Sequence, residues 1–274
     1  MVEYQIIEEK DLKIKHKESF FKLFSKSFER DLSQREWEHL FINSPYGNSI
    51  LILGLHENEV VGSTNLIPQK LIIQGKCYEY YLLATSAVDE EFRSEGVYLK
   101  ILAKAKDVLI SGSKEFLLAF PNKKAYPLLI KLLQFIALEK REIATLASEH
   151  FNSFKFADPL NSLFFEPSFM NWRLEHKDYF LSERENNLLI CKDYEKSIDV
   201  LEVLDKKNIW LKENFQTKEF NINKTSINVL QNRLDSASIS HVEKTDAIYP
   251  VYWAKDQGLD LTRVDIRLLM SDVF

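Results

Sequence analysis

The chain has 274 residues, 45% of them hydrophobic, and a formal net charge of −5 at pH 7. This length is sufficient for one large hydrophobic core or two smaller ones. The negative charge balance argues against a nucleic-acid-binding surface, although local basic strips are compatible with it. We therefore expect no nucleic-acid partner.

The two cysteines, Cys77 and Cys191, fall in segments predicted as strands and lack the spacing of a zinc site or a disulfide framework. We expect both to be buried free thiols in a reducing cytoplasm. The six histidines are scattered without ligand spacing, so no metal site is predicted. The N-terminus has no signal-like segment, and no run of about 18 apolar residues occurs. These features predict a cytoplasmic protein without an integral membrane segment, and they leave a peripheral membrane association open.

The first part of the chain is predicted as one strand followed by two helices. Residues 3–7 favour an extended strand, and residues 14–30 repeat phenylalanine at helical spacing. Ser33 and Glu36 form a capping box that starts a second helix. The sequence Asn43-Ser-Pro-Tyr-Gly47 ends that helix in a turn.

Strands dominate the next segment. A meander of four strands is predicted at residues 50–55, 60–67, 70–73 and 77–88. Leucines at helical spacing then predict a helix from residue 99 to 109, a short apolar run predicts a strand at 115–120, and a further helix covers 128–133. This order predicts an α/β fold with a mixed sheet.

The strongest functional signal lies between Ala84 and Leu99, where a strand, a charged turn, Gly96 and a helix follow one another. A helix N-terminus leaves backbone N–H groups without partners and carries a partial positive charge. A glycine in front of it lets a phosphate approach the backbone closely. The junction therefore predicts a phosphate-binding site, with a charged turn capped by a glycine as the purely structural alternative.

This turn resembles the pyrophosphate signature Arg/Gln-x-x-Gly-x-Gly/Ala of the GNAT family of acyl-CoA-dependent N-acyltransferases. Arg93 to Gly96 match its first four positions, whereas Tyr98 replaces the second small residue. Asn122 and Ala125 match the Asn-x-x-Ala pattern that opens the next helix in that family, and Val60-Val61-Gly62 resembles a family hairpin. The ordered matches span about residues 1–140. They imply a GNAT fold with acetyl-CoA or another acyl-CoA as co-substrate.

The resemblance also implies a set of cofactor-binding residues. The main chain of Ala87 and Val88 corresponds to the strand that pairs with the pantetheine arm, and Asn122 to the residue that contacts this arm. The pyrophosphate would be held by the turn, chiefly through its N–H groups. The turn consists of Arg93, Ser94, Glu95, Gly96, Val97 and Tyr98.

The general base and acid are less well marked. Where relatives carry a glutamate base, this chain has Thr85, whose hydroxyl can hold a water that relays the proton. Glu79 is the nearest upstream carboxylate, with a solvated strand residue as the alternative. Leu129 stands where relatives often have a tyrosine acid, and Tyr126 is the nearby tyrosine, with packing as its alternative role. Expelling a thiolate at neutral pH costs only about 2 kcal/mol, so weak acid–base groups need not stop the reaction.

The second half of the chain is interpreted as a degenerate copy of the first, which predicts domains at 1–142 and 143–274. Trp37 and Trp172 lie 135 residues apart, and apolar hairpins follow both, at residues 50–61 and 188–204. Coincidence is the alternative. The second half has no Arg-x-x-Gly turn after a strand, so we expect it to shape the acceptor pocket without binding a second cofactor. Large amphipathic side chains there suit either a core or a sugar-stacking wall: Trp172, Arg173, Trp210 and Trp253.

Short matches also resemble a long GNAT subgroup associated with bacterial surface-polysaccharide gene clusters. They lie at Trp37 to Gly47, Phe120 to Asn122 and Trp172-Arg173. The resemblance implies acyl transfer to a small amine, for which an amino sugar is one candidate. Two alternatives are kept: a non-catalytic GNAT-fold binding or scaffold protein, and an acyltransferase with a carrier-bound donor. A homodimer is also compatible with the sequence.

Overall fold

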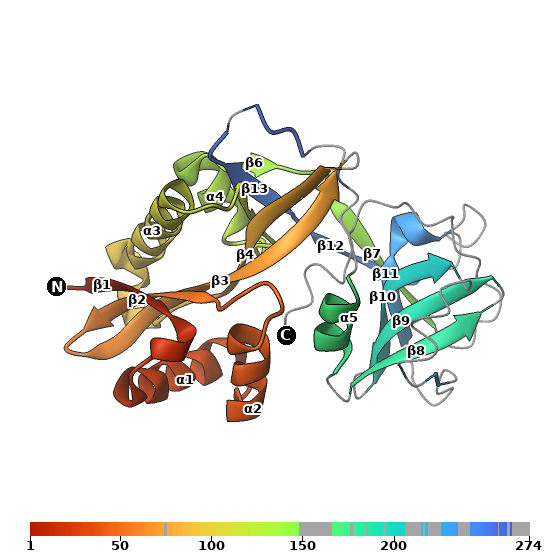
Figure 1. Ribbon diagram of the computed structural model, residues 1–274, viewed down its shortest axis with the longest axis horizontal. Coiled ribbons are helices and arrows are strands. Elements are labelled where there is room, and N and C mark those ends of the chain that lie inside the picture. Colours follow the sequence, from red (N-terminus) through yellow and green to blue (C-terminus); the bar gives the residue numbers. More distant parts are fainter. Residues whose placement is uncertain are drawn as a thin grey trace. The chain divides into compact units, whose positions relative to one another are not determined.

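The computed structural model describes residues 1–73, 76–147, 166–175, 178–184, 186–193, 196–205, 215, 217–218, 226–234, 242–256, 258–261 and 264. The chain divides into two compact units, each built on its own mixed sheet (Figure 1). Unit 1 comprises Met1–Leu138, Leu163–Trp172 and Val251–Arg263. Unit 2 comprises Glu139–Ser162, Arg173–Pro250 and Val264–Phe274. The predicted division at residues 142 and 143 was continuous in sequence, whereas each unit is assembled from three segments.

Unit 1 begins with one strand and two helices, as predicted. β1 (Glu3–Glu8) leads through a short 3-10 turn (Glu9–Asp11) to α1 (Ile14–Phe28), and α2 (Gln34–Trp37) continues as a π-helical turn (Glu38–Ile42). The Ser33 hydroxyl accepts a hydrogen bond from the Glu36 N–H at 3.2 Å, which confirms this half of the predicted capping box. The helix α1 buries Phe20 and Phe24 completely.

The sheet of unit 1 has the order β1-β2-β3-β4-β5-β13-β6. Its remaining strands are β2 (Ile50–His56), β3 (Glu59–Ile73), β4 (Lys76–Val88), β5 (Phe116–Ala119), β6 (Ile136–Ala137) and β13 (Val251–Ala254). Strands β1 to β4 form an antiparallel meander, β4 and β5 are parallel, and β13 is antiparallel to both β5 and β6.

The two strands predicted at 60–67 and 70–73 are a single strand, β3. Pro68 does not break it, because β2 pairs with β3 only as far as Leu66 and Pro68 therefore pairs with β4 alone. On such a free edge the missing N–H of a proline removes no ladder hydrogen bond.

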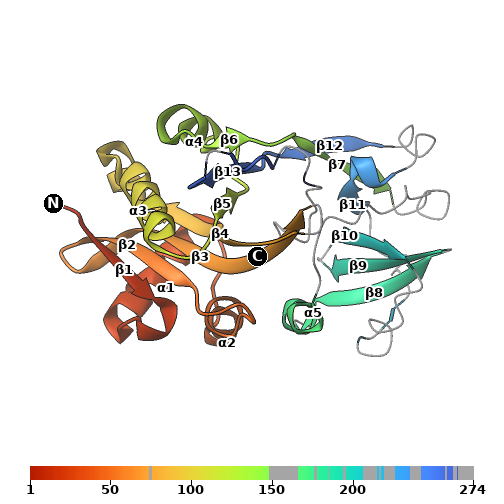
Figure 2. The same cartoon turned by 45° about the horizontal axis from the view of Figure 1, so that its top comes forward.

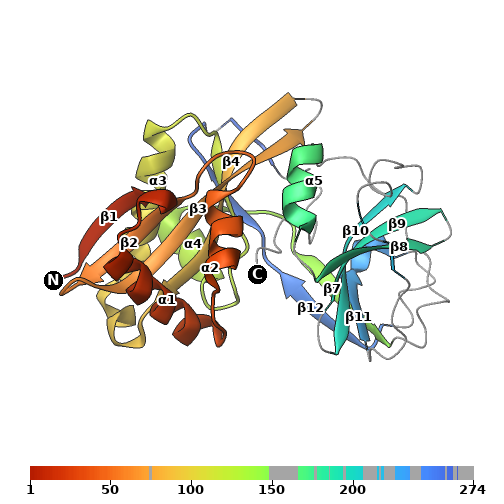
Figure 3. The same cartoon turned by 60° about the horizontal axis from the view of Figure 1, so that its bottom comes forward.

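The helices α3 (Val97–Ser111) and α4 (Tyr126–Leu133) cover one face of this sheet, and α1 and α2 cover the other (Figure 2, Figure 3). The core beneath α3 consists of Ile52, Leu66, Tyr81, Leu83, Val88, Val97, Ile101, Leu102, Ala105, Leu109, Leu117, Ala119, Leu129, Phe135 and Val251. This set, called core 1 below, includes Val97 of the predicted phosphate turn.

Two paired glycines bring α3 close to the sheet. Gly54 of β2 lies opposite Gly62 of β3. A Cβ at Gly62 would lie 2.7 Å from Val97 Cγ1 and 2.8 Å from Ile101 Cδ1, and a Cβ at Gly54 would lie 3.2 Å from Val97 Cγ1. The Val60-Val61-Gly62 pattern thus has a packing reason: it lets the first turn of α3 lie on the strands.

In unit 2, the sheet has the order β12-β7-β11-β10-β9-β8. Its strands are β7 (Arg141–Ala147), β8 (Tyr179–Arg184), β9 (Asn187–Asp193), β10 (Ser197–Asp205), β11 (Ser226–Leu230) and β12 (Lys244–Ile248). Strands β8 to β10 form an antiparallel meander, β10 and β11 are parallel, and β7 is antiparallel to both β11 and β12. The helix α5 (Pro167–Leu174) contributes residues up to Trp172 to unit 1.

The two sheets share one plan, in which a meander is followed by a parallel pair and then by two antiparallel strands. The strand beside the parallel pair is distant in sequence from that pair in both sheets: β13 in unit 1 follows all of unit 2's strands, and β7 in unit 2 precedes that unit's meander. Matching the parallel pairs aligns β10 with β4, and hence β9 with β3. The predicted repeat aligned residues 188–191 of β9 with residues 50–53 of β2, which is one strand out of register. Apolar strands resemble one another too closely for sequence to set this register.

The expectation that both cysteines are buried is wrong for Cys77. Cys77 is exposed, because it pairs with Ile72 near the end of the β3–β4 hairpin, before β5 begins to cover β4 at Tyr80. Cys191 is buried in unit 2, and this burial raises the pKa of its thiol. Among the described residues, no helix is both long enough and apolar enough to span a membrane.

We expect Gly62→Ala to lower the free energy of unfolding by about 1–3 kcal/mol, because its Cβ forces α3 away from β3. Urea denaturation of Gly62→Ala, Val97→Ala and the double variant measures this effect. Val97→Ala removes the Cγ1 atom that the new Cβ meets, so the double variant should lose less than the sum of the single losses. Additive losses would contradict the close contact.

Residues 1–142 expressed alone should be poorly soluble. They lack β13, which pairs with β5 from Val251 opposite Ala119 to Ala254 opposite Phe116 and buries Val251 and Tyr252. Without it, β5 presents an unpaired edge beside exposed core. The measurement is the soluble, monomeric yield of this fragment, and the control is the same fragment joined through a flexible linker to residues 249–263. A well-folded fragment without β13 would contradict this prediction.

Candidate active site

The candidate site lies where the two parallel strands of unit 1 stop pairing. β4 pairs with β5 only from Tyr80 to Leu83, because β5 ends at Ala119, whereas β4 continues to Val88. From residue 84 onward, β4 is paired with β3 on one edge and with no described strand on the other. This edge can pair with an extended ligand through main-chain hydrogen bonds. Ala87 and Val88, the predicted pantetheine contacts, lie in this segment.

A β-bulge at Thr85 bends β4 at this point. Asn65 pairs with Ala84 and Ser63 with Ala87, so that Thr85 and Ser86 together oppose Thr64. Thr85 has a φ of 48°, which is an outlier for a β-branched residue and costs on the order of 1–3 kcal/mol. The surroundings hold this conformation, because Asn65 Nδ2 donates to Thr85 Oγ1 at 2.7 Å and the Thr64 and Ser86 hydroxyls are 2.6 Å apart.

A buried carboxyl that sequence reasoning missed lies near this bulge. Glu9 is fully buried, and its Oε2 accepts a hydrogen bond from Trp37 Nε1 at 3.0 Å. Burial raises the pKa of Glu9 to about 8, although the Trp37 hydrogen bond, the Lys17 charge and the Asn65 side chain lower it in part. Glu9 is therefore mostly neutral at pH 7. Nothing in the local sequence distinguishes it from the exposed Glu8 beside it.

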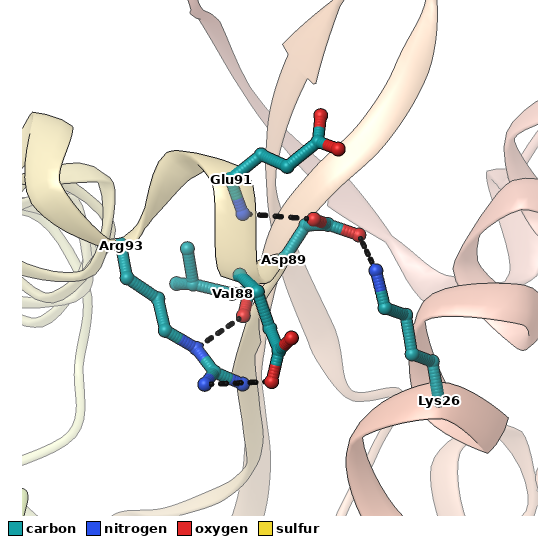
Figure 4. Close-up of polar contacts among 6 residues, drawn as sticks. Lys26, Val88, Asp89, Glu91 and Arg93 are labelled. Atoms are coloured by element: carbon teal, nitrogen blue, oxygen red, sulfur yellow. Dashed lines mark hydrogen bonds and ion pairs between the residues drawn. The ribbon is translucent and has the colours of Figure 1, made fainter.

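The phosphate turn has the predicted order of strand, charged turn, glycine and helix. After β4 comes a 3-10 turn (Glu90–Glu95), which Asp89 caps by accepting a hydrogen bond from the Glu91 N–H at 3.1 Å. Asp89 also pairs with Lys26 of α1 at 2.9 Å, a contact that lowers the Asp89 pKa (Figure 4). Arg93 Nε donates to the Val88 carbonyl, and its guanidinium pairs with Glu90, each at 3.2 Å. The turn is thus fastened to the end of β4 and to α1.

Gly96 follows in a left-handed conformation, with φ 73°. A Cβ built on it meets no atom within 4 Å, so the space in front of the backbone is open where α3 begins. The helix starts at Val97, so the N–H groups without intrahelical partners come from its first turn, whereas Ser94 and Glu95 belong to the 3-10 turn. Tyr98 packs against core 1, and burial raises its pKa.

The charges around the turn are unfavourable for an anion. Lys26 and Arg93 pair with Asp89 and Glu90, whereas in the described part of the chain Glu91 and Glu95 have no ion-pair partner. A phosphate at this turn would therefore depend on backbone N–H groups and the helix dipole more than on cationic side chains.

The remaining predicted site residues divide between the two ends of β4. Asn122 follows the end of β5, and its Oδ1 accepts from the N–H groups of Lys124 and Ala125 at 3.0 and 2.9 Å, so it opens α4 as the motif implied. Tyr126, the first residue of α4, packs against core 1. Because parallel strands end at the same edge of a sheet, Asn122 follows the edge that carries the bulge.

Glu79 lies at the other end of β4. It forms an ion pair with Lys114 at 2.7 Å, and this hydrogen bond lowers its pKa. Six residues of extended strand separate Glu79 from Thr85, which corresponds to about 20 Å. The structure therefore does not bring these two candidate catalytic residues together.

Of the large amphipathic side chains named above for the second half, those in the described residues contact different neighbours. Trp172 donates to the His39 carbonyl at 2.7 Å and stacks on the His39 ring. Trp253 packs against core 1 with Lys106 Nζ 4.5 Å above its ring, and Arg173 lies 5.6 Å over Tyr179. These contacts fit the packing alternative better than a sugar-stacking wall. Trp210 lies outside the described residues, as do His150, His176 and His241.

No protein-family model and no curated protein matches the chain by sequence. Solved structures match it by fold. A GCN5-related N-acetyltransferase (GNAT) from Kribbella flavida superposes with a TM-score of 0.61 at 12% identity, over 92% of this chain and 72% of that chain. One from Anabaena variabilis superposes with a TM-score of 0.56 at 7% identity, over 90% of this chain and 72% of that chain. The chain has the GNAT fold.

A conserved protein of unknown function from Enterococcus faecalis has a similar TM-score, 0.62, at 10% identity, over 93% of this chain and 72% of that chain. All three similarities extend over both units. At these identities they establish the fold alone. Most of the predicted cofactor residues lie on the bulged β4, on the turn at Gly96 and at the start of α3, and Asn122 lies just before α4.

Replacing the buried carboxyl should change how stability depends on pH. The folded-state pKa of Glu9 is about 8, above the ordinary value of 4.5, so between these values the folded state retains a proton that the unfolded state has lost. The free energy of unfolding therefore falls as pH rises through this window. Glu9→Gln needs no proton and should be more stable than the parent by about 3 kcal/mol at pH 7, with less slope between pH 5 and 8.

Chemical denaturation across this pH range measures the effect. The control is Glu8→Gln, because Glu8 is half-exposed and pairs with Lys10, a contact that lowers its pKa. This substitution should leave the slope between pH 5 and 8 in place. Identical slopes in the parent protein and Glu9→Gln would show that Glu9 is ionised in the folded state.

Proposed function

We propose that this protein is an N-acyltransferase that moves an acetyl or other short acyl group from acyl-CoA to a small amine. The observation that carries the proposal is the open, left-handed Gly96 at the start of α3, directly after the edge of β4 that β5 leaves unpaired. Together these two features fit a long ligand that has a phosphate at one end and an extended amide chain at the other. Acyl-CoA has this form.

Each part of the donor would be held by a different element. The N–H groups at the start of α3 would hold the pyrophosphate, with the backbone of Arg93 to Tyr98 around it. The main chain of Ala87 and Val88 would pair with the pantetheine arm. Asn122 would contact this arm through its amide nitrogen, because its Oδ1 already accepts hydrogen bonds from two N–H groups of the turn that opens α4.

The chemistry requires a neutral amine, an oxyanion site and a leaving thiolate. The bound acyl-CoA supplies the thioester, and attack by the amine nitrogen forms the C–N bond as the C–S bond breaks. N–H groups on the free edge of β4 can donate hydrogen bonds to the developing oxyanion. The Thr85 hydroxyl would hold the water that takes up the amine proton, and the thiolate then receives a proton. Tyr126 remains a weaker candidate acid because it packs against core 1, and Glu79 lies too far along β4.

An amino sugar is the acceptor that the resemblance to the surface-polysaccharide subgroup favours. Unit 2 would then complete the acceptor pocket or stabilise unit 1, and it would bind no cofactor. A binding protein that retains the donor site without turnover is the second candidate. Two features favour that alternative: a threonine stands in place of a base, and Glu91 and Glu95 of the 3-10 turn have no ion-pair partner within the described ranges.

Substitution of Gly96 tests the donor site. Asn and Asp both tolerate a left-handed backbone and have nearly the same size, so Gly96→Asn and Gly96→Asp differ mainly in one charge. We expect acetyl-CoA to bind the parent with one molecule per chain, Gly96→Asn more weakly, and Gly96→Asp at least tenfold more weakly than Gly96→Asn. Isothermal titration calorimetry measures all three. Equal affinities of Asn and Asp variants would contradict a phosphate at this position.

Turnover distinguishes the two candidates. Release of free thiol from acetyl-CoA in the presence of a panel of amines and amino sugars would support the acyltransferase. Binding of acetyl-CoA at the Gly96 site without thiol release from any acceptor would favour the binding protein.

A further inference from the structure

A short series of buried polar groups connects the 3-10 turn after β1 to the bulge of β4. It runs from Trp37 of α2 to Glu9, and from Asn65 of β3 to Thr85 of β4. Two of its hydrogen bonds are formed, Trp37 Nε1 to Glu9 Oε2 at 3.0 Å and Asn65 Nδ2 to Thr85 Oγ1 at 2.7 Å. Glu9 and Asn65 are fully buried and Thr85 is 6% exposed. Glu9 and Asn65 are excluded from water, so partners for their side chains must come from within the network, whereas Thr85 stands at its end.

Between the two bonds lie two buried atoms, Glu9 Oε1 and Asn65 Oδ1, that have no hydrogen-bond partner among the described residues. Both are acceptors when Glu9 is ionised, and the Asn65 side chain is close enough to the carboxyl to lower its pKa. A proton on Glu9 Oε1 is the donor that Asn65 Oδ1 lacks. In this arrangement Asn65 Nδ2 donates to Thr85, so the Thr85 hydroxyl hydrogen is left to point away from the network.

Ionisation of Glu9 favours the opposite arrangement. A carboxylate accepts but cannot donate, so the Asn65 amide is better turned with Nδ2 toward Glu9 and Oδ1 toward Thr85. Thr85 then donates its hydrogen to Asn65 and presents only lone pairs outward. The two arrangements contain the same side chains and differ in one proton and one amide rotation.

We propose that Glu9 is a positioning residue that, through Asn65, sets whether the Thr85 hydroxyl donates or accepts at the acyl-transfer centre. The inference rests on the proposed function for what Thr85 does, but the coupling between Glu9 and Thr85 can be measured without turnover. Neutral Glu9 leaves the Thr85 hydrogen free for the water or the thioester oxygen. Charged Glu9 withdraws it.

The groups that face Glu9 come from three elements. Lys17 of α1 lies with Nζ 4.0 Å above the Trp37 ring, Trp37 comes from α2 and Asn65 from β3. Lys17 is the charge among them that favours the carboxylate, and burial opposes it more strongly, which gives the pKa of about 8. The exchange between the two arrangements is therefore expected at mildly alkaline pH.

The indole N–H resonance of Trp37 reports on Glu9 directly, and loss of a peak in Trp37→Phe assigns it. In the intact protein we expect this resonance to shift with a midpoint near pH 8, and not to shift in Glu9→Gln. Thr85→Val keeps the shape but removes the hydroxyl. The neutral arrangement then leaves an Asn65 N–H without an acceptor, and an orphan donor costs more than an orphan acceptor. The midpoint should therefore fall in Thr85→Val.

Ser86→Ala is the matched control, because the Ser86 hydroxyl pairs with Thr64 beside the network and not within it. It should leave the midpoint in place. An unchanged midpoint in Thr85→Val, or an equal change in Ser86→Ala, would overturn the coupling. A lower midpoint in Thr85→Val alone supports it, even if no amine is acylated, in which case the proposed function is what fails.

The ratio of kcat in Glu9→Gln to kcat in the parent gives the second readout, because the ionisation of the amine cancels in this ratio. Gln resembles neutral Glu at every pH. We expect a ratio near one at pH 7, a rise of up to about tenfold per pH unit above pH 8, and little change in KM. Thr85→Ser should retain activity that Thr85→Val loses. A ratio independent of pH would overturn the role of Glu9 in setting the Thr85 hydroxyl.

Discussion

The unequal length of two parallel strands is the constraint on which the candidate site depends. β5 ends at Ala119, after pairing with β4 only from Tyr80 to Leu83, and β4 continues to Val88. If β5 paired with β4 along its full length, the main-chain N–H and C=O groups on this edge of residues 84–88 would be hydrogen-bonded within the sheet. Because it does not, an edge of β4 stays without a partner among the described strands, and the bulge at Thr85 bends it. The turn at Gly96 follows directly.

Close packing of α3 determines where that turn lies. The helix can rest on β2 and β3 because Gly54 and Gly62 leave no side chains beneath Val97. Its N-terminus is thereby placed at the end of β4, and the ion pair of Asp89 with Lys26 ties the turn to α1 on the opposite face. The apolar contacts and the ion pair thus position a helix N-terminus that directly follows a largely acidic 3-10 turn.

Each sheet depends on a closing strand that lies far along the chain from the strand it covers. β5 would be an edge strand without β13, and β11 without β7. Each sheet therefore takes its closing strand from a distant part of the chain. The chain passes between the two sheets through short connections, three residues between β6 and β7 and two residues between β12 and β13. Unpaired edges are sites of aggregation, so unit 1 depends on β13, which follows unit 2's strands in sequence, and unit 2 depends on β7, which precedes its other strands.

The sequence by itself determined the features that depend on neighbours in the chain. It predicted the order of strand, charged turn, Gly96 and helix, the cap at Ser33 and the turn from Asn122 to Ala125. Local hydrogen bonds and backbone conformation specify these features. These motifs were sufficient to indicate the GNAT fold. Tertiary structure alone decided which distant groups meet. It buried Glu9 beside Trp37 and Asn65, exposed Cys77, separated Glu79 from Thr85, and paired β13 with β5. No local pattern carries this information, since burial and strand pairing depend on residues far apart in sequence.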